Sequence, residues 1–138
     1  MRLFASVLAA AAALVTQIVP VLAHPAEGLA GSRWAVETLN GDAMREPFGA
    51  PKLTFSPTHI HVNSGCRPFR AALDGDGDTH LFRIEPDPMI AIACADYLEK
   101  RQWALARVVG EATRIEREGD RLSIATEDGE TLEAVRLD

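Results

Sequence analysis

Hydrophobic and polar side chains alternate in short runs from residue 33 to the end of the chain. Such alternation is typical of half-buried β-strands, because successive side chains point to opposite faces of a sheet. Glycine, proline, asparagine and aspartate fill the gaps between the runs, as expected for tight turns. Eight strands are predicted: Arg33–Leu39, Lys52–Phe55, His59–Asn63, Phe69–Leu73, Leu81–Glu85, Ala112–Arg117, Leu122–Thr126 and Thr131–Leu137.

One segment changes to the helical period. Asp96 and Glu99 have the spacing of a capping box at a helix start, and Gly110 has the place of a C-cap. Four residues between them share one helical face: Leu98, Gln102, Leu105 and Val109. The predicted fold class is therefore α+β, with an antiparallel sheet of about eight short strands curled into a partial barrel and closed by one helix.

The N-terminal segment has a different pattern. Arg2 precedes a long apolar run over Leu3–Val15, and Val21-Leu22-Ala23 ends the segment with small residues at the positions that a signal peptidase reads. The apolar run is shorter than the roughly 20 residues needed to span a bilayer, which disfavours the alternative of a retained membrane anchor. We expect residues 1–23 to be a signal peptide, 24–32 a flexible lead-in and 33–138 the folded domain.

Charge and cysteine content agree with export. The chain carries 14 Lys and Arg against 20 Asp and Glu, so its net charge of −6 gives no basic surface for nucleic acid. Cys66 and Cys94 are the two cysteines. An even count in an exported protein favours a structural disulfide, whereas the alternative of a reactive thiol pair usually has the C-x-x-C spacing, which is absent here. The sequence therefore predicts a periplasmic or secreted protein that is soluble after cleavage, without stable membrane insertion.

Several short motifs follow one another in a specific order. They are Gly31-Ser32-Arg33-Trp34, Asn63-Ser64-Gly65-Cys66, Ile92-Ala93-Cys94 before the helix, Asp120-Arg121-Leu122 and Asp128-Gly129-Glu130. In this order the chain resembles the META domain family, HslJ-like, over nearly all of the predicted domain. The resemblance implies a protein of the cell envelope associated with stress or drug tolerance, and it brings no accepted catalytic mechanism.

One segment has the spacing of a calcium loop. Residues 74–85 place carboxylates at positions 1, 3, 5 and 12 of an EF-hand pattern. Thr79 stands where the sharp turn needs glycine, and prolines on both sides prevent the two bounding helices. A hairpin turn between Leu73 and Leu81 is the favoured interpretation.

Three histidines are candidate metal ligands. His59 and His61 lie two residues apart on one strand and so share its outer face, while Ile60 faces the core. His80 is a candidate third ligand, since a tight zinc or copper site needs three or four. A periplasmic zinc- or copper-binding protein is thus the alternative to the family-based function, and solvent-facing histidines are the simpler interpretation.

No residues have the pattern of a catalytic site. Ser64 and Cys66 lack a neighbouring base, and acidic pairs fall at predicted turns. Trp34 and Trp103 are interpreted as core anchors rather than as the lining of a ligand pocket. We therefore expect a non-enzymatic protein with no cofactor, acting on an envelope protein or a small ligand.

Overall fold

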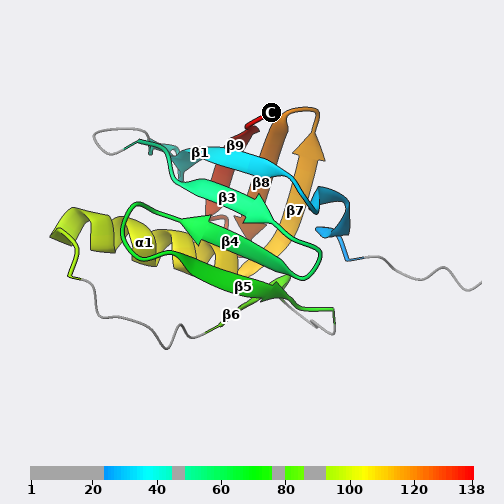
Figure 1. Cartoon of the computed structure of the whole chain (residues 1–138), viewed down its shortest axis with the longest axis horizontal. Helices are drawn as coiled ribbons and strands as arrows, with labels where there is room; N and C mark the ends of the chain where they lie inside the picture. The colour runs from blue at the N-terminus through cyan, green and yellow to red at the C-terminus, as the bar shows by residue number, and fades with distance from the viewer. Residues whose placement is uncertain (1–23, 45–48, 76–79, 86–92) are drawn as a thin grey trace, which may run out of the picture.

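The computed structural model describes residues 24–44, 49–75, 80–85 and 93–138. These residues contain one α-helix, α1 (Asp96–Gly110), and a single antiparallel sheet (Figure 1). The strands are β1 (Arg33–Leu39), β2 (Asp42–Ala43), β3 (Lys52–Phe55), β4 (His59–Asn63), β5 (Phe69–Leu73), β6 (Phe82–Ile84), β7 (Ala112–Glu118), β8 (Arg121–Thr126) and β9 (Thr131–Arg136). A short 3-10 helix, η1 (Glu27–Leu29), precedes them.

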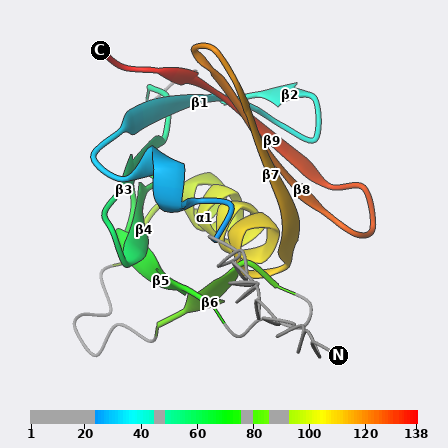
Figure 2. The same ribbon diagram turned by 90° about the vertical axis from the view of Figure 1, so that its right-hand side faces the viewer.

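The sheet curls into a nearly closed barrel. Its strand order is β6-β5-β4-β3-β1-β9-β8-β7, with β2 paired to β1. Seen along the barrel, the strands form a ring, and α1 packs with one face toward the interior of this ring (Figure 2). The helix contacts β5, β6, β8 and β9, so it joins the two ends of the sheet. The predicted α+β partial barrel closed by one helix is confirmed, and β2 is a ninth strand that the sequence pattern missed.

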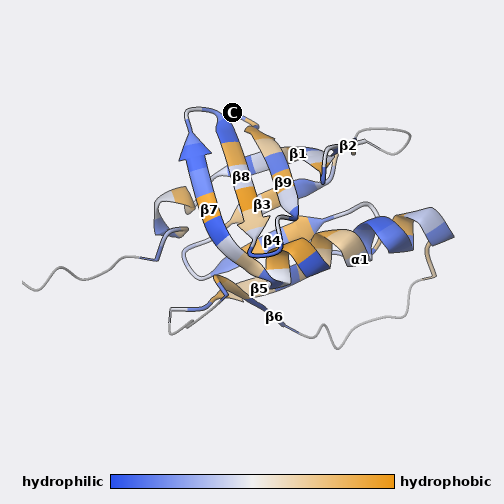
Figure 3. Ribbon diagram, turned by 180° about the vertical axis from the view of Figure 1, so that it is seen from behind, coloured by the Kyte–Doolittle hydropathy of each residue, from blue (hydrophilic) through white to orange (hydrophobic). Residues whose placement is uncertain are grey.

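The alternation of side chains builds the core as predicted. In β8, Leu122 and Ile124 are fully buried on either side of the more exposed Ser123, and Trp34 of β1 is fully buried as expected. Figure 3 shows hydrophobic and hydrophilic residues alternating along β8. The indole N–H of Trp34 donates to Ser32 Oγ at 2.8 Å, which satisfies its one polar group. Aromatic and aliphatic side chains from the strands and from α1 thus form one continuous core cluster.

Residues 24–32 correct the expected flexible lead-in. Ala26 and Leu29 are buried in the core cluster, and η1 packs at one end of the barrel. His24 Nδ1 accepts the N–H of Ala26 at 3.1 Å, and its Nε2 lies 2.9 Å from the carbonyl oxygen of Leu81. The small apolar side chains of this segment cover the barrel end, which explains why it packs despite its loop-like composition. Residues 1–23, the predicted signal peptide, lie outside the described residues.

The predicted helix caps are also corrected. Ala95, not Asp96, is the N-cap, and its backbone carbonyl accepts the N–H groups of Leu98 and Glu99. Asp96 is the first helical residue, where its charge still favours the positive end of the helix dipole. Gly110 is the last helical residue rather than a left-handed cap. A Cβ on Gly110 would lie 3.0 Å from Ile84 Cδ1, so glycine there allows the helix to approach β6 closely.

The segment with calcium-loop spacing forms the favoured hairpin. Leu73 of β5 pairs with Phe82 of β6, and the N–H of Asp74 donates to the carbonyl of Leu81 at 2.9 Å. Residues 76–79 lie outside the described residues. Within the described part of the chain, no helix is long and apolar enough to cross a bilayer.

Candidate functional site

The Asn63-Ser64-Gly65-Cys66 motif builds a clamp between the sheet and α1. The backbone turns sharply at Gly65, with φ of +90°, and Asn63 Oδ1 accepts the Gly65 N–H at 3.1 Å. Cys66 is bonded to Cys94, directly before the helix, with a Cα–Cα distance of 5.8 Å. The predicted disulfide is thus present, and the motif has a structural role at this end of the barrel.

Gln102 completes this clamp from the helix. Its Oε1 accepts the backbone N–H of Arg67 at 2.8 Å and lies 3.5 Å from the buried hydroxyl of Ser64. Arg67 Nη2 in turn lies 3.6 Å from Oε1 of Glu99, the residue predicted to complete the capping box with Asp96. These contacts fix one face of α1 against the β4–β5 connection and leave another face of the helix uncovered.

Trp103 lies on the uncovered face, which corrects its predicted place in the core. Its exposed fraction is 66%, the largest among the exposed large hydrophobic residues of the described chain. The inward face of α1 carries Arg101, Leu105, Val108 and Val109 instead. Because Trp103 is two residues from Leu105, it points about 200° away from it around the helix axis. A helical wheel of this segment therefore contained the signal that Trp103 faces outward.

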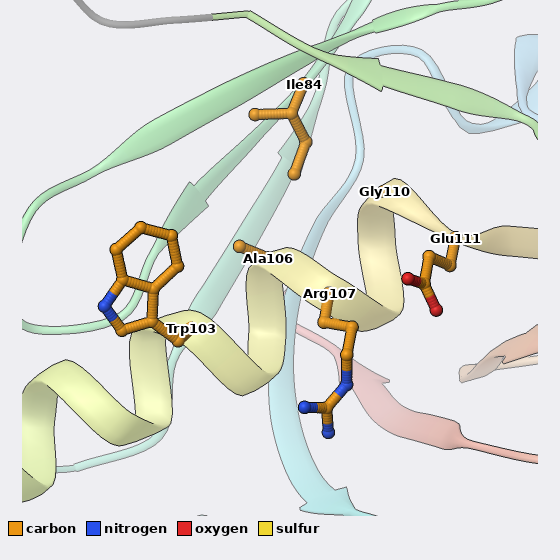
Figure 4. Close-up of a pocket in the computed structure, with 6 residues that line it drawn as sticks. All are labelled: Ile84, Trp103, Ala106, Arg107, Gly110 and Glu111. Atoms are coloured by element: carbon orange, nitrogen blue, oxygen red, sulfur yellow. The ribbon is translucent and has the colours of Figure 1, made fainter.

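Trp103 forms one side of a shallow apolar groove of about 370 Å³. Figure 4 shows Trp103 and Ala106 on the helix and Ile84, from β6, above them. Ala106 lies between the other two side chains. Ile84 is 37% exposed and sits over the helix because Gly110 has no side chain to keep it away. The groove is lined by Ile84, Trp103, Ala106, Arg107, Gly110 and Glu111. Apart from Trp103, none of these residues has a sequence pattern that predicts a site.

The cation at the groove rim is already neutralised. Arg107 makes two hydrogen bonds to Glu130, from Nε to Oε2 at 3.0 Å and from its terminal nitrogen to Oε1 at 2.6 Å. These hydrogen bonds, more than the general charge attraction, raise the pKa of Arg107 and lower that of Glu130. The ion pair of Arg107 with Glu130 therefore holds the guanidinium at the edge of the groove, and the lining between Trp103 and Ile84 is apolar.

The predicted histidine pair occupies the outer face of β4, with ring centroids 6.1 Å apart. His59 Nε2 lies 3.1 Å from Glu85 Oε1, and its Nδ1 lies 2.8 Å from the hydroxyl of Thr58. Both ring nitrogens of His59 thus have partners. Arg70 Nε is 2.7 Å from Glu85 Oε2, an ion pair in which the N–H is poorly aligned for a hydrogen bond. The hydrogen bond from His59, followed by the charge of Arg70, lowers the pKa of Glu85.

These contacts do not assemble a metal centre. Within residues 24–44, 49–75, 80–85 and 93–138, no group of three His, Cys, Asp or Glu side chains is arranged to hold a metal ion. His80, the candidate third ligand, is exposed in the β5–β6 connection. The structure therefore brings two of the three predicted histidines together, and one of them, His59, contacts the carboxylate of Glu85.

Arg101 is a further residue that sequence reasoning missed. It is 8% exposed, and its two terminal nitrogens donate to the carbonyls of Met44 and Gly49 at 3.0 and 2.8 Å. Burial lowers the pKa of its guanidinium. Arginine nevertheless carries its positive charge in proteins at physiological pH. Arg101 thus ties the helix to the chain on both sides of residues 45–48.

Comparison with known proteins gives a family and a fold. The sequence model of the META domain matches residues 27–138. One solved NMR structure aligns with a TM-score of 0.59 at 20% identity, covering 79% of this chain and 92% of its own. A second NMR structure, of a protein from Burkholderia xenovorans, aligns with a TM-score of 0.56 at 18% identity, covering 81% and 86%. At these identities the likeness is one of fold alone. No curated protein sequence matches the chain.

Proposed function

Because this chain belongs to the META domain family, we propose that it is a non-enzymatic binding module, exported to the cell envelope and acting there in stress or drug tolerance. The observation that carries the proposal is the apolar groove between Trp103 and Ile84. Trp103 is 66% exposed and lies beside the apolar Ile84 and Ala106, and tryptophan is enriched where proteins meet.

The chemistry of the groove favours an apolar side chain of a partner protein over a small molecule. Small-molecule sites combine an apolar lining with a few free polar groups that orient the ligand. Here Ile84, Ala106 and Gly110 supply the apolar lining, and the guanidinium of Arg107 is already bound to Glu130. The remaining charged residue of the lining, Glu111, lies at the end of the groove away from Trp103 (Figure 4). A protruding aliphatic or aromatic side chain needs only the apolar surface that the groove offers.

Export is supported by two features of the chain. Residues 1–23 have the charge, apolar run and small-residue ending of a signal peptide. Cys66 and Cys94 form a disulfide, which persists in oxidising compartments such as the periplasm. The exported protein should therefore begin at His24, and intact-mass analysis of the periplasmic fraction reads that end directly. A mass that includes residues 1–23 would contradict cleavage.

Complementation of a deletion strain tests the binding role. Trp103→Ser removes the exposed ring from the groove, whereas Tyr97→Ser removes an exposed aromatic ring from the same helix outside the groove. We expect both variants to melt close to the wild type, and only Trp103→Ser to fail to restore growth under envelope stress. Full rescue by Trp103→Ser, or equal failure of both folded variants, would contradict a role for the groove.

A further inference from the structure

Strand β7 (Ala112–Glu118) presents an open edge. It ends the strand order of the sheet and pairs only with β8. Among the described residues, one backbone hydrogen bond crosses from β7 toward β6: the N–H of Leu81 donates to the carbonyl of Ala112 at 2.8 Å. Beyond that first residue, no other strand of the described residues pairs with this edge of β7.

The hairpin between β7 and β8 fixes which backbone groups face this edge. Glu118 and Arg121 are paired across a two-residue turn, so the backbone of Glu118 points toward β8. Backbone direction alternates along a strand, which turns the N–H and C=O groups of Arg117 and Ile115 to the open edge. Ile115 therefore lies at the centre of the backbone N–H and C=O groups that face this edge.

The side chains along this edge are charged in a self-complementary order. Arg114 and Glu116 are exposed, and neither makes an ion pair with another described residue. Arg117 lies on the inner side, 5.8 Å from the centroid of the Trp34 ring, so alternation places Ile115 inward as well and Arg114 and Glu116 outward. Figure 3 shows β7 as mostly hydrophilic, as expected for a protected edge.

We propose that two copies of this chain associate by antiparallel pairing of β7 with β7, with Ile115 on the two-fold axis. In this register Arg114 of each copy faces Glu116 of the other, giving two opposite-charge pairs on the same outer face. They fall at non-hydrogen-bonded positions, where facing side chains lie closest. The backbones of the two Ile115 residues exchange both hydrogen bonds at the centre.

Neighbouring registers are electrostatically unfavourable. An axis through Arg114, Glu116 or Arg117 would place that charged residue opposite itself. The charges therefore reject other registers and unmatched strands while allowing one symmetric pairing. The other edge of the sheet, β6, is three residues long and therefore offers a second strand a shorter template than β7 does.

Charge reversal and its restoration test the pairing. Sedimentation equilibrium of the purified protein should show a weak dimer that is populated at about 100 µM and above, as expected for a small interface. Arg114→Glu should raise the dimer dissociation constant about tenfold, because two attractive cross-strand pairs become repulsive. The double variant Arg114→Glu/Glu116→Arg should return it to within about twofold of the wild-type value, since the pairs are rebuilt with opposite sign.

A matched control separates this contact from a change in net charge. Lys52→Glu makes the same charge change on β3, an interior strand, and should leave the dissociation constant unaltered. A wild-type chain that is monomeric at about 1 mM would overturn the proposal, because even weak interfaces are populated there. So would a dimer that Arg114→Glu does not weaken, or a folded double variant that fails to regain dimerisation.

Discussion

Replacing Cys66 and Cys94 together with alanine should lower the free energy of unfolding by about 3.6 kcal/mol at 25 °C. The two cysteines are separated by 28 positions, so the bond closes a loop of 29 residues when both ends are counted. In the chain-entropy description, closing a loop of that length removes about 12 cal/mol/K from the unfolded ensemble. The effect acts mainly on the unfolded chain, so the far-ultraviolet spectrum of the folded variant should match the wild type.

The expected change in melting temperature follows from the size of the domain. Unfolding entropies near 60 °C are about 2.1 cal/mol/K per residue, which gives about 0.24 kcal/mol/K for residues 24–138. A loss of about 3.6 kcal/mol then corresponds to a fall of about 15 °C. Differential scanning calorimetry measures the shift, and urea titration measures the free energy independently.

The single variants are the internal control. Cys66→Ala and Cys94→Ala each remove the bond, so each should cost nearly as much as the double variant rather than half of it. A double variant that melts within about 3 °C of the wild type would refute the reasoning, because the loop would then contribute little entropy to the unfolded state.

Three further changes are predicted from single contacts. Gly65→Ala should destabilise the fold by about 1–2 kcal/mol in urea titration, because φ is +90° there. Gly28→Ala is the control and should be nearly neutral, because Gly28 has an ordinary φ and open space around it. Equal effects of the two variants would contradict a conformational cost at Gly65. Ser32→Ala should cost about 1–3 kcal/mol, because it leaves the buried indole N–H of Trp34 without its acceptor, and a loss below about 0.5 kcal/mol would contradict that. Glu85 has a pKa below its ordinary value of 4.5, so its carboxylate stabilises the fold above that pH, and this contribution is lost as the pH falls through the lowered pKa. Glu85→Gln should therefore make the free energy of unfolding less dependent on pH below about pH 4.5. An unchanged pH dependence would contradict the ion pair of Glu85 with Arg70.

The strands were predictable because their signal is local. A fully buried side chain at every second position, as in Leu122 and Ile124, produces a pattern that no other structure explains as simply. Strand β2 (Asp42–Ala43) has two exposed residues and therefore no such pattern; its pairing depends on the neighbouring β1. The packing of residues 24–32 was missed for a similar reason, since Ala26 and Leu29 become core residues only when the barrel end is present.

The candidate groove was not predictable as a unit. It combines Ile84 from β6 with one face of α1, and their approach depends on the missing side chain of Gly110. The sequence signals only that Trp103 lies opposite Leu105 on the helix, and a preference for tryptophan in cores outweighed that signal. Gln102 was placed on the apolar helix face for its spacing, although its amide is used to hold the backbone of Arg67.

Photo-crosslinking from inside the groove tests the proposed binding function most directly. A photoreactive amino acid is placed at position 103 in the chain expressed in its own cells, and at position 97 in a parallel strain as the control on the same helix. The account predicts a discrete envelope-protein adduct from position 103 that is absent from position 97 and is lost when Ile84→Glu puts a charge into the groove. Identical adducts from both positions, or an adduct from position 103 that survives Ile84→Glu, would contradict binding through the groove.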